Sequence, residues 1–77
     1  MTDVQREKEC FVRHELRDLL KAIDSNILTA EYRVTPTGEE YVYITWFRDE
    51  ERDYTVKRNV TGNSLIAITR DVLEVVE

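Results

Sequence analysis

The run Glu40-Tyr41-Val42-Tyr43-Ile44-Thr45-Trp46-Phe47 is the longest β-type segment in this 77-residue chain, and the other elements can be placed around it. Aromatic and β-branched side chains fill it, and such side chains suit a pleated, half-buried surface. Because successive residues of a strand point to opposite faces, one face carries Val42, Ile44 and Trp46. The other face carries Tyr41, Tyr43, Thr45 and Phe47. The run is therefore predicted to be a central strand with one apolar and one amphipathic face.

The turn Thr35-Pro36-Thr37-Gly38 joins this run to a strand predicted over residues 27–35. Pro36 presets φ for a type I turn, and Gly38 can take the left-handed position that follows it in a three-residue hairpin loop. A loop shorter by one residue would turn the faces over, so that the two apolar sets would no longer meet. With the three-residue loop, the predicted facing pairs are Tyr32 with Val42, Ala30 with Ile44, and Leu28 with Trp46.

A second turn, over residues 48–52 with Asp49 to Glu51 as its loop, leads to a third strand predicted over residues 52–60. This turn has no glycine, so the pattern leaves its type open. The facing pairs are Trp46 with Tyr54 and Ile44 with Val56, and the opposite side of the third strand carries Asp53, Thr55, Lys57 and Asn59.

Two amphipathic helices are predicted to flank the strands. Thr2 and Gln5 have the spacing of a capping box, and residues 24–26 are expected to end the first helix with Asn26 in the left-handed conformation. Ser64 is expected to cap the second helix. The first apolar stripe is Val12, Leu16, Leu19, Leu20 and Ile23, with Phe11 beside it and Val4 as an extension. The second is Leu65, Ile68, Val72, Val75 and Val76, widened by Ile66 and Leu73, with a strand after Val72 as the alternative.

The sequence therefore predicts one α+β domain over residues 1–77, in α-β-β-β-α order. Three antiparallel strands form a meander, and both helices pack on the face that holds Val42, Ile44 and Trp46. The opposite face is expected to meet solvent or a partner.

Composition limits the chemistry that this domain can perform. The net charge of −5 disfavours binding to nucleic acid or to an anionic membrane surface. Cys10 and His14 are the only soft metal ligands, so neither a metal site nor a cofactor is expected. They lie one helical turn apart, but the chain shows no oxyanion site to complete a catalytic pair, and the protein is interpreted as a non-enzyme. The absence of a signal-like N-terminus predicts a cytoplasmic protein.

The outer sheet face is the candidate site for contact with a protein partner or with a second copy of the chain. It combines the aromatic residues Tyr41, Tyr43 and Phe47 with Arg33 and Lys57 from the neighbouring strands. Aromatic rings flanked by cations can anchor a protein partner. The alternative is an ordinary solvated face stabilised by cross-strand pairs.

A basic row of Arg13, Arg17 and Lys21 on the first helix supports a second hypothesis, a nucleic-acid-binding domain that stacks bases on the same rings. Glu9 lies four residues before Arg13, however, and acidic neighbours make a solvated, ion-paired helix face the preferred interpretation.

Two resemblances accompany these expectations. The helix-strand-strand-strand-helix order resembles the double-stranded-RNA-binding domain, which uses lysines at the start of its second helix. That start here is Asn63-Ser64-Leu65-Ile66-Ala67, with no basic residue before Arg70, so RNA binding is not expected. The segment of residues 60–73 resembles small uncharacterised accessory proteins of bacterial mobile elements, which implies a bacterial, cytoplasmic setting and no particular mechanism.

Overall fold

A computed structural model of the chain describes residues 1–48, 50 and 52–76. Its elements are α1 (Asp3–Phe11), the π-helical turn η1 (Val12–Leu16), α2 (Arg17–Ile23), β1 (Ile27–Val34), β2 (Glu40–Phe47), β3 (Asp53–Asn59) and α3 (Leu65–Val76). The first three follow one another without a break and form one long helix over residues 3–23. The predicted α+β fold with α-β-β-β-α order is confirmed.

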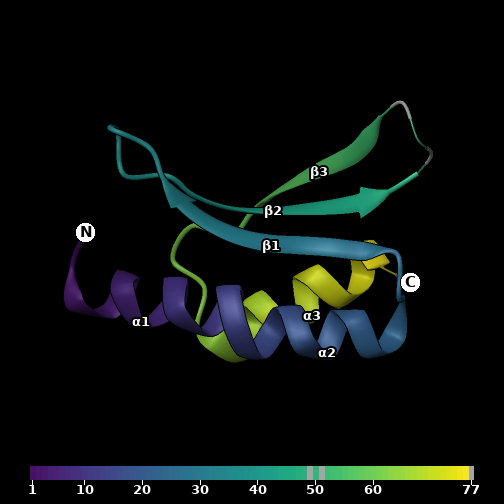
Figure 1. Cartoon of the computed structure of the whole chain (residues 1–77). Helices are drawn as coiled ribbons and strands as arrows, with labels where there is room; N and C mark the ends of the chain where they lie inside the picture. Colours follow the sequence, from purple (N-terminus) through teal and green to yellow (C-terminus); the bar gives the residue numbers. More distant parts are fainter. Residues whose placement is uncertain (49, 51, 77) are drawn as a thin grey trace.

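The molecule has two layers, with the long helix and α3 together on one side of the sheet (Figure 1). The antiparallel strands are ordered β1-β2-β3, so β2 is central as predicted. Within the described part of the chain, the space between the layers is filled by eleven buried apolar residues: Val12, Leu16, Leu20, Ile27, Ala30, Tyr32, Val42, Ile44, Val60, Ile68 and Val72. Among the described residues, no helix or strand covers the other side of the sheet (Figure 1).

The turn chemistry sets the pairing of β1 with β2 as predicted. Gly38 has φ of +89°, and its N–H donates to the carbonyl of Thr35 at 3.0 Å. The register that follows places Tyr32 opposite Val42, Ala30 opposite Ile44, Trp46 opposite Tyr54, and Ile44 opposite Val56. The predicted second loop includes Asp49 and Glu51, which lie outside the described residues.

The prediction that Leu28 faces Trp46 is wrong. The register shifts between Ile27 and Thr29, as it does at a β-bulge, and Ile27 pairs with Trp46 instead. Ile27 is buried and Leu28 is 36% exposed. The cause is the short connection from the helix, where the N–H of Ile27 donates to the carbonyl of Asp24 at 3.1 Å and fixes Ile27 over the core.

The predicted stripe of the long helix is wrong in its second half. Lys8, Val12, Leu16 and Leu20 are buried. In a regular α-helix, side chains four residues apart drift around the helix axis by about 40°, so such a series would turn away from the sheet. The wider turn of η1 absorbs much of that drift and keeps this four-residue series over the sheet. The same rotation leaves Leu19 44% and Ile23 52% exposed, and Val4 is 62% exposed. The assignment of Ile66 to the stripe of the last helix is also wrong, because Ile66 lies about 200° around α3 from the buried Ile68 and is 74% exposed.

The helix ends mostly follow their sequence signals. The capping box of Thr2 and Gln5 is present, and the hydroxyl of Ser64 accepts from the N–H of Ala67 at 3.2 Å. Asn26 is not left-handed, since positive φ occurs among the described residues only at Gly38 and Gly62. Instead its N–H donates to the carboxylate of Asp24 at 3.0 Å, so a side chain closes this turn. The helix α3 runs to Val76, which rules out a strand after Val72.

Candidate functional site

The structure brings the predicted contact residues together on the uncovered face of the sheet. Arg33 of β1 lies opposite Tyr41, and Lys57 of β3 lies opposite Tyr43. Phe47 ends the same row of β2 and is 47% exposed. This face, made of Tyr41, Tyr43, Phe47, Arg33 and Lys57, is called the outer face below.

The two cations of the outer face lie over tyrosine rings that are diagonal to them. The guanidinium carbon of Arg33 is 5.2 Å from the ring centroid of Tyr43, and Nζ of Lys57 is 4.7 Å from that of Tyr41. Diagonal cross-strand neighbours are within reach of long side chains. Both rings are half-buried, and each has a cation over its face.

Polar pairs complete the outer face. A carboxylate oxygen of Glu31 lies 2.6 Å from Nη2 of Arg33, and the hydroxyls of Thr45 and Thr55 are 3.1 Å apart. The hydroxyl of Tyr41 donates to Glu39 at 3.3 Å. Aromatic and charged side chains thus lie side by side on the outer face and contact one another.

The basic row lies on the flank of the long helix that faces β1. Arg17 donates from Nε to the carbonyl of Leu28 at 3.3 Å, which ties this part of the row to the strand. Arg13 borders a shallow pocket that Arg33 also lines, so the structure joins the row to the edge of the outer face. Glu9 and Glu31 line the same pocket and interrupt its positive charge.

The other candidate groups lie apart from this face. Cys10 and His14 are both exposed on the long helix. Among the residues that the structure describes, no three His, Cys, Asp or Glu side chains gather into a metal-binding group. None of the helices within the described ranges is long and apolar enough to cross a membrane.

A buried charged cluster was missed by the sequence analysis. Glu40 is 5% exposed and Lys8 is 8% exposed, and Nζ of Lys8 lies 2.9 Å from Oε1 of Glu40. The hydroxyl of Tyr32 donates to the same oxygen, and the N–H of Gly62 donates to Oε2 at 2.7 Å. The side chain of Glu40 thus joins α1, β1 and the segment before α3.

The backbone of Glu40 holds the same segment a second time. Its N–H donates to the hydroxyl of Thr61 at 2.9 Å, and its carbonyl accepts from the N–H of Val60 at 2.9 Å. Alternation along β2 could have identified Glu40 as an inward-facing carboxylate, because it lies two residues before Val42. Lys8 likewise lies four residues before Val12 on the helix.

The surroundings of the cluster shift two pKa values. Burial raises the pKa of Tyr32, and its hydrogen bond to Glu40 and the charges of Glu40 and Glu9 raise it further. Burial alone would also raise the pKa of Glu40. The hydrogen bonds from Gly62, Tyr32 and Lys8, together with the Lys8 charge, outweigh burial and hold the pKa of Glu40 below its ordinary value of 4.5.

We expect the protein to lose stability in acid through this carboxylate. A carboxyl group whose pKa is lower in the folded chain stabilises the fold fully above its unfolded pKa, and this contribution disappears as the pH falls through the folded pKa. Urea unfolding between about pH 6 and about pH 3 should give a falling free energy of unfolding, and Glu40→Gln should flatten that fall. Equal slopes for the two proteins would show that Glu40 is not responsible.

No protein-family model, curated protein or solved structure matches this chain.

Proposed function

We propose that the protein is a small non-enzymatic binding module that contacts another protein through the outer face. The observation that carries the proposal is the one-sided architecture, in which both helices cover one side of the sheet (Figure 1). The aromatic row of β2 alternates with the buried Val42 and Ile44 and therefore lies on the other side. Protein interfaces are enriched in tyrosine, phenylalanine and arginine, and such residues often supply most of the binding energy.

The cations over the two tyrosine rings support this proposal. Because Arg33 and Lys57 hold Tyr43 and Tyr41 in place, less side-chain freedom is lost when a partner binds. Phe47 then provides an exposed apolar anchor at one end of the row. The partner can be a different protein or a second copy of this chain.

The rival function, nucleic-acid binding, uses the same rings together with the basic row. The shared pocket of Arg13 and Arg33 is the observation in its favour, while Glu9, Glu31 and the net charge of −5 oppose it. It predicts affinity for single-stranded RNA or DNA that falls steeply as salt rises. A gel-shift at low salt with no bound species would exclude it.

The outer-face variant, Tyr43→Thr with Phe47→Thr, should weaken binding to the protein partner by at least about tenfold. Threonine preserves β propensity at both positions, so the loss should come from the missing rings. The measurement is quantitative crosslinking and affinity purification of parent and variant from cells that express the protein, with circular dichroism to verify folding.

The matched control for this experiment is Leu19→Gln with Ile66→Gln, which changes two exposed side chains on the helical side of the molecule. This control variant should retain every association that depends on the outer face. If the outer-face variant stays folded and retains every association of the parent, the outer face is not the contact site.

A further inference from the structure

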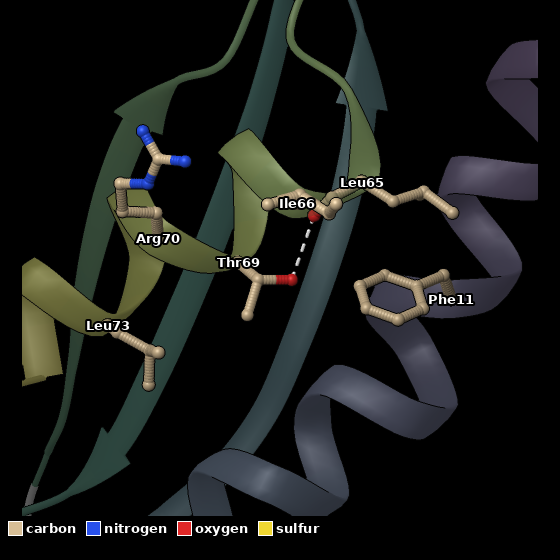
Figure 2. A pocket seen from close by; sticks show the side chains of 6 residues that line it. All are labelled: Phe11, Leu65, Ile66, Thr69, Arg70 and Leu73. Atoms are coloured by element: carbon tan, nitrogen blue, oxygen red, sulfur yellow. Dashed lines mark hydrogen bonds between the residues drawn. The ribbon is translucent and has the colours of Figure 1, made fainter.

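A groove separates the two helices on the side of the molecule away from the outer face. Phe11 of the long helix forms one wall, and Leu65, Thr69 and Leu73 of α3 form the other (Figure 2). Its volume is about 400 Å³. The hydroxyl of Thr69 donates to the carbonyl of Leu65 at 2.8 Å, so this hydroxyl is already hydrogen-bonded within α3. The lining of the groove is therefore predominantly apolar.

Helix geometry places further exposed apolar side chains on the long helix beyond the lining of the groove. The rotation at η1 places Leu19 and Ile23 on the flank of Phe11, and Val4 lies on that flank two turns earlier. From Val4 to Ile23 this stripe runs about 28 Å at 1.5 Å per residue. Ile66, on the α3 side of the groove, is the most exposed large apolar side chain described, at 74%.

The charges beside the groove indicate which charge a partner should carry. Glu7 lies one turn before Phe11 and Glu15 about one turn after it, so both carboxylates border the apolar stripe. Arg70 is the cation of the lining, and in Figure 2 its guanidinium points away from Phe11. A second copy of the chain would bring its own carboxylates and its net charge of −5 against the same border.

We propose that this groove binds an amphipathic helix of a partner protein, with its apolar stripe in the groove and basic residues on its flanks. Helix-in-groove recognition uses apolar anchors at three- and four-residue spacing, which a stripe of this length can accept over several turns. Basic flanks would lie beside Glu7 and Glu15. The site is independent of the outer face, so the two proposals can fail separately.

The test uses three synthetic peptides of about 18 residues that share one leucine stripe at helical spacing. One carries lysine flanks, one carries glutamate flanks, and one has the lysine sequence scrambled. Fluorescence anisotropy should show saturable binding of the lysine peptide to the whole protein and at least about tenfold weaker binding of the other two. Equal binding of the lysine and glutamate peptides, or no binding, would overturn the proposal.

The groove variant, Leu19→Gln with Ile66→Gln, should lower the affinity for the lysine peptide by at least about tenfold without changing the net charge. Glu7→Gln with Glu15→Gln should also weaken binding and reduce its dependence on salt. The outer-face variant should bind as the parent does. Unchanged binding by the groove variant would overturn the proposal, as would self-association in sedimentation that this variant abolishes.

Discussion

Replacing Glu40 by alanine is expected to lower the free energy of unfolding by about 3–5 kcal/mol. The change leaves the ammonium group of Lys8 buried without its carboxylate and removes the acceptor of Tyr32 and of the Gly62 N–H. A chain of this length has a total stability of about 4–12 kcal/mol, so the loss is a large part of it. Urea unfolding followed by circular dichroism measures the difference.

The control separates the buried charge from the hydrogen bonds. In the double variant Lys8→Met with Glu40→Gln, neither charge remains, and the amide oxygen can still accept from the N–H of Gly62. Replacing a buried ion pair by neutral groups of similar size is often nearly neutral, so the double variant should be more stable than Glu40→Ala. A loss of less than about 1 kcal/mol in Glu40→Ala would show that water reaches the cluster.

The position of Glu40 shows what the sequence could predict and what it could not. The local chemistry of Pro36 and Gly38 fixes the register of β1 with β2. Alternation along β2 then assigns Glu40 to the inward side of the sheet. The partners of Glu40 come from residues 8, 32 and 62, which only the packed fold brings together. Local signals thus give the register, while the buried pairing is a tertiary property.

The errors at Leu28, Leu19 and Ile23 have a common origin. Each prediction assumed a regular period, two residues for the strand and 3.6 for the helix. The bulge in β1 and the wide turn of η1 each interrupt that period by a local change in backbone pairing. The amino-acid pattern carries no separate signal for either irregularity.

The outer face was predicted more fully than the helical side. Its members follow directly from the register, and all five are where the pattern placed them. The diagonal contacts of Arg33 and Lys57 with the tyrosine rings were not predicted, because the lean of long side chains decides them. The apolar groove was missed because the predicted helix stripe assigned Leu19 and Ile23 to the core.

Leu20→Ala is expected to lower the free energy of unfolding by about 2–5 kcal/mol, while Leu19→Ala should lower it by less than about 1 kcal/mol. Leu20 is fully buried and Leu19 is 44% exposed, although they are neighbours in α2. Alanine favours the helix at both positions, so the difference measures burial alone. The paired urea unfolding curves test the rotation that η1 imposes, and similar losses for the two variants would contradict it.

The same pair of variants links the fold to the proposed groove. Because the side chain of Leu19 is 44% exposed, its truncation should cost little stability, so this variant can separate an effect on binding from an effect on folding. We expect Leu19→Ala to keep the stability of the parent and to weaken binding of the lysine peptide by several fold. A variant that loses stability and binding together would place Leu19 in the core and outside the proposed binding surface.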